Sequence, residues 1–222
     1  MRIGIIGAGN IGGTLTRRLC ALGHEVAVAN SRGPQTLADL AQETGARAVS
    51  VEEAPREAQL VIVTIPEKRI PELPSDLFAQ AAADVVVVDT GNYYPRQRDG
   101  RIDAIEQGMT ESRWVESQLG HPVIKAFNNI YAAHLLEHGR AKGEAGRIAL
   151  PVAGDDERGK RVVLDLVDEL GFDPVDAGGL DDSWRQQPGT PVYGTDLDAD
   201  GVREALQRAS RERPAEFSAD GE

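Results

Sequence analysis

The sequence predicts an α/β fold built on a mainly parallel, doubly wound sheet with helices on its faces. Short apolar runs alternate with helical patterns from residue 2 to residue 175, and this alternation is typical of parallel sheets with crossover helices. One run, residues 84–89, contains four consecutive valines, as central strands buried on both faces do. We expect this domain to cover residues 1–180 and a short, partly irregular C-terminal extension to cover residues 181–222.

Each strand is predicted from a short apolar run bounded by turn residues. In chain order, the strands are expected at residues 2–6, 25–29, 46–50, 60–63, 84–89, 122–126, 148–152 and 172–175. Each helix is predicted from apolar residues three and four positions apart, and Gly23 and Gly171 end two of these helices. The helices are expected within residues 11–22, 34–44, 111–119, 130–138, 162–170 and 202–209. Residues 90–100 are expected to form a loop, and the tail after Pro214 to be disordered.

The balance of charge excludes some classes of partner. The chain of 222 residues has 24 Lys and Arg against 36 Asp and Glu, a net charge of −12. Nucleic acids and anionic membranes are bound through basic patches, so we expect neither as a partner. Cys20 is the only cysteine, which rules out an intramolecular disulfide and a multi-cysteine zinc site. No apolar run reaches the roughly 18 residues that span a bilayer, and residue 1 does not begin a signal-peptide pattern, so we expect a cytoplasmic protein.

The strongest local motif is a glycine-rich turn between the first predicted strand and the first predicted helix. It reads Gly7-Ala8-Gly9-Asn10-Ile11-Gly12. Gly7 allows the tight turn, Gly9 lets the backbone approach a pyrophosphate, and Gly12 lets the helix pack close to the sheet. The first turn of the helix offers unpaired N–H groups to the anion. A Rossmann-type dinucleotide site is therefore predicted, with these glycines, Asn10 and Ile11 as cofactor-binding residues.

The end of the second predicted strand indicates which dinucleotide is bound. A site that prefers NAD usually has an acidic residue there for the ribose 2′-hydroxyl. This chain has Asn30-Ser31-Arg32 instead. Arg32 provides a forked cation for a 2′-phosphate, and Ser31 and Asn30 provide neutral hydrogen bonds. NADP is therefore the expected cofactor.

Three further strand ends should meet at the same edge of the sheet, because ligands bind outside the carboxyl ends of strands in such folds. Thr64-Ile65-Pro66 follows one strand, Asn92 the next, and Asn128 the one after. We expect all of them to bind the cofactor near its ribose and nicotinamide. Asn128 has a second interpretation, as a cap of the helix that follows.

With these motifs in this order, the chain resembles the NADPH-dependent reductases of coenzyme F420, also called F420-dependent NADP oxidoreductases. The resemblance also rests on residues 124–130, 151–156 and 176–180, and it extends to about Thr190. It implies that Ser31 and Arg32 bind the 2′-phosphate and that Thr64, Ile65 and Pro66 line the nicotinamide region. It further implies F420 as a co-substrate and a homodimer. The sequence departs from the family pattern in residues 90–100 and 182–193, where the second substrate should bind.

The sequence contains no obvious catalytic dyad. A flavin-like acceptor requires little acid–base chemistry from the protein, whereas a carbonyl or imine requires a proton donor. The candidate catalytic residues are Lys125, Tyr93, Asn128 and Arg185, and Tyr94, His134 and Tyr193 are further possible proton donors. Trp184 could stack on a planar ring. We expect no metal site, because the histidines are scattered and His134 is interpreted as a packed or surface residue.

Three functions remain open at this point. The first is hydride transfer between NADPH and coenzyme F420 or a similar flavin-like acceptor. The second is NADPH-dependent reduction of a small carbonyl or imine on the same scaffold. The third is NADP(H) binding or sensing without catalysis.

Overall fold

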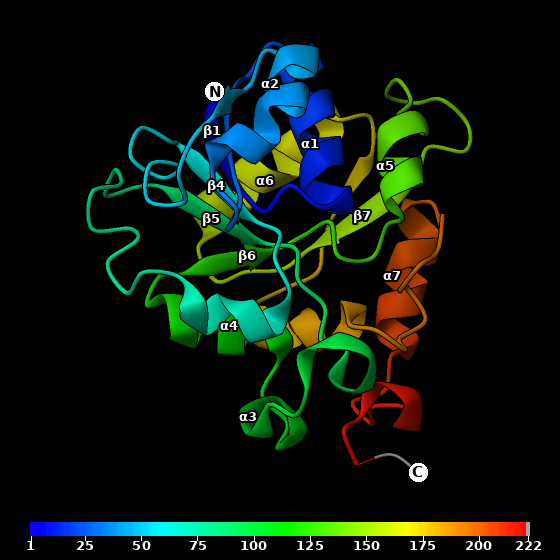
Figure 1. Cartoon of the computed structure of the whole chain (residues 1–222). Coiled ribbons are helices and arrows are strands. Elements are labelled where there is room, and N and C mark those ends of the chain that lie inside the picture. Colours follow the sequence, from blue (N-terminus) through cyan, green and yellow to red (C-terminus); the bar gives the residue numbers. More distant parts are fainter. Residues whose placement is uncertain (221–222) are drawn as a thin grey trace.

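The computed structural model describes residues 1–220, and its centre is a six-stranded parallel sheet (Figure 1). The strand order is β3-β2-β1-β4-β5-β6, which is the order of a doubly wound dinucleotide-binding fold. The strands are β1 (Arg2–Ile6), β2 (Glu25–Ala29), β3 (Arg47–Ala48), β4 (Leu60–Val63), β5 (Val86–Asp89) and β6 (Val123–Lys125). Because every neighbouring pair in this sheet is parallel, the predicted fold class is confirmed.

The two faces of the sheet bury alternate residues of each strand against different helices. On one face, Ile3 and Ile5 of β1 pack in a cluster with residues of α1 (Asn10–Ala21), α5 (Ala132–Glu137) and α6 (Glu157–Glu169). On the other face, Ile6 belongs to a cluster with residues of α3 (Asp103–Glu106) and α4 (Glu111–Leu119). Figure 1 shows α1 and α6 above the sheet and α4 below it. The remaining helices are α2 (Ala38–Thr44), which a single 3₁₀ turn (Pro34–Leu37) precedes, and α7 (Ala199–Arg208).

Two of the predicted strands form a separate small sheet. β7 (Ala149–Val152) and β8 (Asp173–Asp176) pair with each other in parallel, and α6 connects them. One antiparallel bridge joins this pair to the main sheet: the Lys125 N–H donates to the Ala153 carbonyl (2.7 Å), and the Ala153 N–H donates back (3.0 Å). The chain at Ala153, directly after β7, therefore runs antiparallel to β6.

The C-terminal extension packs on this small sheet. A 3₁₀ segment (Leu180–Gln186) is followed by irregular chain and then by α7. Val202, Ala205 and Leu206 of α7 are buried against Ala149 and Val175 of the two strands. Among residues 1–220, no helix is long and apolar enough to cross a bilayer.

Two segments differ from the sequence-based expectations. Within the expected loop of residues 90–100, Pro95–Asp99 forms one wide helical turn. The structure also gives a defined conformation to part of the tail for which we expected disorder. Ser218 Oγ donates to one carboxylate oxygen of Glu106 (3.0 Å), and the Ala219 N–H donates to the other (3.0 Å). The sequence pattern did not indicate this distant carboxylate, and residues 221–222 of the tail lie outside the described residues.

Candidate dinucleotide-binding site

The glycine turn between β1 and α1 is packed so closely that two of its glycines cannot be replaced without strain. Gly7 has φ +109°, and a Cβ there would lie 2.5 Å from the carbonyl oxygen of Thr64. A Cβ on Gly12 would lie 1.9 Å from the carbonyl oxygen of Gly7. The Thr64 hydroxyl donates to that same carbonyl (3.2 Å). These contacts hold the first turn of α1 against the ends of β1 and β4, as predicted.

Gly9, which directly precedes α1, has a different environment. No heavy atom lies within 4 Å of the position that its Cβ would take. The backbone at this position is therefore open on the side where a pyrophosphate would approach the helix N-terminus. This geometry fits a dinucleotide phosphate, and a side chain at Gly9 would occupy the same space.

A cleft of about 630 Å³ runs along the ends of β1, β2 and β4. It is lined by eight of the predicted cofactor-binding residues: Gly7, Gly9, Asn30, Ser31, Arg32, Thr64, Ile65 and Pro66. Gly12 is buried beneath the turn, and Asn10 lines a neighbouring hollow beside α1 instead. Ile11 is half-buried against the core. The structure thus brings residues of the glycine turn and the Asn30-Ser31-Arg32 segment together in one cleft.

The hydrogen bonds of the segment after β2 involve the backbone of Arg32 and not its guanidinium. The Asn30 side-chain oxygen accepts from the Arg32 N–H (2.9 Å), and the Asn30 amide donates to Thr36 (2.9 Å). Within residues 1–220 the Arg32 guanidinium has no hydrogen-bond or ion-pair partner. Lys68 and Arg69 also line the cleft, although sequence analysis did not select them.

Those two further cations are already engaged. Lys68 Nζ donates to the carbonyl of Arg98 (2.5 Å), and Arg69 forms an ion pair with Glu72 (2.6 Å). Glu72 and Glu52 also line the cleft. Of these three cations, Arg32 is therefore the one best able to receive an anion without breaking an existing contact.

Polar side chains at the ends of β5 and β6 lie under the C-terminal extension. Asn128 Nδ2 donates to Asn92 Oδ1 (3.0 Å) and to the carbonyl of Gln186 (2.7 Å), and Gln186 Nε2 donates to Asn128 Oδ1 (3.0 Å). Asn128 is buried, and neither it nor Asn92 lines the 630 Å³ cleft. The two asparagines therefore meet as predicted, and contact between them and a cofactor stays a prediction.

Gln186, the partner of Asn128, was not identified from the sequence, because the polar stretch around it shows no periodicity. The neighbouring Asn129 is also buried, and its carbonyl accepts from the Gly194 N–H (2.9 Å). In the part of the chain that the structure describes, the side-chain amide of Asn129 has no hydrogen-bond partner. Residues 186–194 consequently cover the end of β6.

Lys125 was expected to face a pocket, but the structure buries it completely. Its Nζ donates to Asp89 Oδ2 (3.0 Å) and to the carbonyl of Gly91 (2.6 Å). Burial by itself lowers the pKa of Lys125, but the carboxylates of Asp89, Glu111 and Glu67 outweigh it and raise the pKa. This ammonium belongs to a buried ion pair and does not line the cleft.

Glu67, which directly follows the Thr64-Ile65-Pro66 segment, belongs to the same buried group and was missed from the sequence. It is fully buried, and neither carboxylate oxygen has a hydrogen-bond partner among residues 1–220. Burial, and then the charge of Asp89, hold the pKa of Glu67 well above its usual range. A Cβ on Gly91 would lie 2.5 Å from the Glu67 carboxylate, so this glycine makes room for the acid.

The other catalytic candidates are dispersed. Tyr93 is fully buried, its hydroxyl accepts from the Ile102 N–H (2.9 Å), and burial raises its pKa to about 12. The hydroxyls of Tyr94 and Tyr193 are hydrogen-bonded to each other, and burial raises the pKa of Tyr193. Arg185 stacks on the ring of Trp184 (4.6 Å to the centroid) and donates to a carbonyl of α7 (3.2 Å). None of these side chains lines the 630 Å³ cleft.

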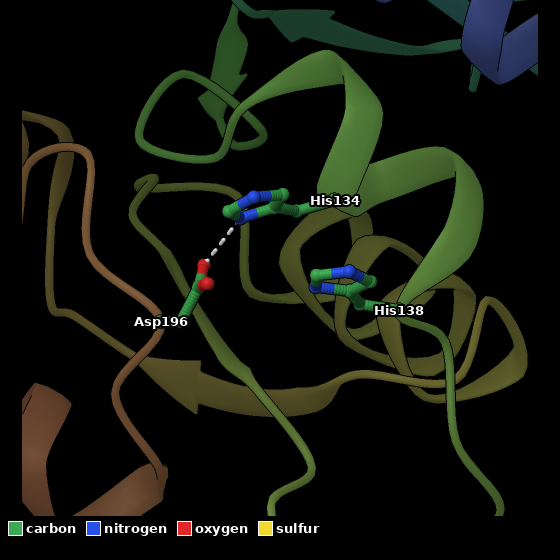
Figure 2. Close-up of side chains that lie close together, drawn as sticks. All are labelled: His134, His138 and Asp196. Atoms are coloured by element: carbon green, nitrogen blue, oxygen red, sulfur yellow. Dashed lines mark hydrogen bonds and ion pairs between the residues drawn. The ribbon is translucent and has the colours of Figure 1, made fainter.

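The histidines are less scattered in space than in the sequence. His134 on α5 and His138, which directly follows this helix, lie close together, and His134 Nδ1 is 2.8 Å from a carboxylate oxygen of Asp196. We expected no metal site, and the tertiary structure nevertheless assembles a set of three potential ligands (Figure 2).

The sheet order, the glycine turn and the cleft define a Rossmann-type dinucleotide-binding protein. Comparison with known families is more specific. Residues 2–93 match the model of the family described as "NADP oxidoreductase coenzyme F420-dependent". The resemblance to this family that was inferred from the motifs is thereby confirmed over these residues.

Two relatives match different shares of the chain. The chain is 42% identical over 78 residues to the protein YjhV of Escherichia coli (strain K12), which covers 35% of this chain and 57% of that one. It therefore spans just over half the length of this curated relative. A hypothetical protein of Sinorhizobium meliloti, SMa0349, has a solved structure with a TM-score of 0.73 and 32% identity, covering 89% of this chain and 95% of that one.

A solved structure from Arthrobacter sp. FB24, whose name assigns it to the F420-dependent NADP reductases, has a TM-score of 0.66. It is 22% identical to this chain, and the match covers 81% of this chain and 85% of that one. At this level of identity the similarity concerns the fold.

Proposed function

We propose that this protein is an NADP(H)-dependent oxidoreductase that transfers a hydride between NADPH and a flat, flavin-like ring, with coenzyme F420 as the first candidate. The observation that carries the proposal is the cleft in which the open backbone at Gly9 and the unpaired guanidinium of Arg32 face the same space. The match of residues 2–93 to the model of the F420-dependent family supports the choice of acceptor.

Each part of the cleft has a task in binding the cofactor. The N–H groups at the start of α1 would bind the pyrophosphate beside Gly9. Ser31 and Arg32 would bind the 2′-phosphate, because a guanidinium matches a phosphate with two parallel hydrogen bonds. Thr64, Ile65 and Pro66 would line the ribose and the ring. The bound NADPH supplies the hydride, and the protein supplies orientation.

The burial of two candidate proton donors away from the cleft supports a flavin-like acceptor. Lys125 and Tyr93 were two of the candidate proton donors, and both are fully buried and engaged in hydrogen bonds. A carbonyl or imine needs a positioned proton donor. A flavin-like ring needs less help from the protein, since the accompanying proton can come from water.

A second candidate is favoured by the C-terminal extension. Residues 186–194 cover Asn128 and Asn129 at the end of β6, where a tricyclic ring would have to lie. A small carbonyl or imine would need less space there. NADP(H) binding without catalysis is the third alternative and would follow if no acceptor supports turnover.

The experiment is NADPH oxidation by the purified full-length protein, followed by the loss of NADPH absorbance. The acceptors are coenzyme F420, FMN as a control, and a panel of small carbonyls and imines. Rapid turnover with F420 and slow turnover with FMN are expected. Turnover with a carbonyl or imine alone would favour the second candidate. Tight NADPH binding in a parallel titration without any turnover would refute the proposed activity.

A further inference from the structure

A group of side chains outside the cleft has the composition of a metal site. His134 lies on α5 and His138, four residues later, caps the C-terminus of this helix, whereas Asp196 lies on the irregular chain between the 3₁₀ segment and α7. One ligand atom from each residue lies within 4.8 Å of the other two. Figure 2 shows the imidazole of His134 on α5 and that of His138 at the end of the helix, both on the side of the segment that carries Asp196.

The spacing of the histidines is what a helix requires for two ligands on one face. Residues four apart are neighbours on a helix surface, and two histidines at this spacing can bind one ion, as in helical zinc sites. The two rings are stacked 4.4 Å apart at an interplanar angle of 18°. The edge of Tyr131 packs against His134 (5.4 Å between centroids), which restricts the rotation of that ring.

The distances are close to those of a ligated ion. In a tetrahedral site with bonds of about 2.0–2.1 Å, neighbouring ligand atoms lie about 3.3 Å apart. The pair formed by His134 and Asp196 is at 2.8 Å and would have to open slightly. The widest separation would have to shorten. Both changes are feasible because the side chains of His134 and Asp196 are 31% and 40% exposed.

The chemistry of the ligand set selects the class of ion. Two imidazoles and one carboxylate suit zinc and the neighbouring divalent transition metals, whereas Mg²⁺ and Ca²⁺ prefer oxygen ligands alone. Three protein ligands leave a fourth position for water. The carboxylate also offsets part of the charge of the ion.

We propose that His134, His138 and Asp196 bind one divalent transition-metal ion, with zinc as the first candidate, and that this ion fixes the C-terminal extension to α5. The extension is held to the same region by the hydrogen bond from the Gly194 N–H to the Asn129 carbonyl. A metal at Asp196, two residues further along, would add a further attachment. The ion would thereby stabilise the segment that covers the end of β6.

The test uses the full-length protein after treatment with a chelator and dialysis. Isothermal titration with ZnCl₂ at a fixed neutral pH measures stoichiometry and affinity. Two variants remove ligands, His138→Ala and Asp196→Asn. The matched control is His121→Ala, which removes a histidine at the far end of α4. Circular dichroism checks that each variant is folded, and Co²⁺ in place of zinc reports the coordination geometry through its visible absorption.

One zinc ion per chain is expected, and each ligand variant should lose at least tenfold in affinity, since even outer partners of metal ligands are worth about 10–100-fold. The control should bind as the wild type does. Zinc at about 100 times its Kd for the wild type should raise the melting temperature of the wild type and the control by about 5–10 °C, and that of His138→Ala by half as much or less. An absence of saturable binding, or binding that His138→Ala and Asp196→Asn leave unchanged, would overturn the proposal.

Discussion

Replacing Arg32 by alanine tests the assignment of the phosphate site most directly. Within residues 1–220 the Arg32 guanidinium is exposed and has no partner, so its removal leaves no buried group without a hydrogen bond. The free energy of unfolding should therefore change by less than about 0.5 kcal/mol. Any loss of cofactor affinity then reports binding and not the fold.

The size of that loss follows from the interaction removed. Hydrogen bonds to a charged group contribute about 1.5–3 kcal/mol, which corresponds to roughly a 10- to 150-fold weaker affinity for NADPH. NADH lacks the 2′-phosphate, so its affinity should hardly change. Because the site is open to solvent, the effect should shrink at high salt.

The assay is a fluorescence titration of wild type and variant with NADPH and with NADH at two salt concentrations. Arg69→Ala is a matched control, since Arg69 lines the same cleft but is already paired with Glu72 at 2.6 Å. It should weaken NADPH binding less than Arg32→Ala does. Equal losses for both cofactors in Arg32→Ala would refute the assignment of Arg32 to the 2′-phosphate.

Three further predictions concern the glycine turn and the buried ionisable groups. Gly12→Ala should destabilise the fold by about 1–3 kcal/mol, because its Cβ would lie 1.9 Å from the Gly7 carbonyl oxygen, whereas Gly9→Ala should keep the stability and weaken NADPH binding. Urea unfolding measures the first effect and an NADPH titration the second. Equal stabilities of the two variants would contradict the packing argument. Lys125→Met should cost about 3–5 kcal/mol in urea unfolding, since it leaves Asp89 buried without its partner; a stable variant with lost turnover would instead favour a catalytic lysine. In the folded state the pKa of Glu67 is raised well above its ordinary value of 4.5, so the folded state binds more protons than the unfolded state above pH 4.5. The contribution of Glu67 to stability is complete below that pH and is lost as the pH rises toward the folded-state pKa. Glu67→Gln should therefore unfold at higher urea than the wild type at neutral pH and show a weaker decline from acid to neutral pH; an unchanged pH profile would show that Glu67 titrates normally.

Local sequence patterns predicted much of the main sheet and several residues that line the cleft, among them Gly9 and Arg32. Residues 2–6 and 25–29 form strands at the predicted positions, because an apolar run between two turns has few other ways to bury its side chains. The task of Gly12 could be stated from the sequence, since it depends on the Gly7 carbonyl in the same turn, whereas the contact between Gly7 and Thr64 joins residues 57 positions apart. Arg32 was selected from the sequence because it directly follows the second strand, and in this fold the residues at that position face the ribose of the dinucleotide.

The surroundings of Lys125 could not be predicted in the same way. A lysine near the carboxyl end of a strand can face a cleft or a buried partner, and the sequence does not say which. Asp89, Glu67 and Glu111 lie far away along the chain, and only the packing of β5, the segment after β4 and α4 brings them to this ammonium. Glu67 carried no sequence signal, because a glutamate at the start of a helical turn is ordinarily exposed.

The sequence by itself determined the α/β class, most of the strands and the glycine turn, because these depend on interactions among residues that are close along the chain. Tertiary structure alone decided that β7 and β8 leave the main sheet, that Gln186 hydrogen-bonds to Asn128, and that Asp196 meets His134. The last two contacts join residues 58 and 62 positions apart. Such contacts follow from how the C-terminal extension packs on the sheet, and no periodicity or local motif encodes that packing.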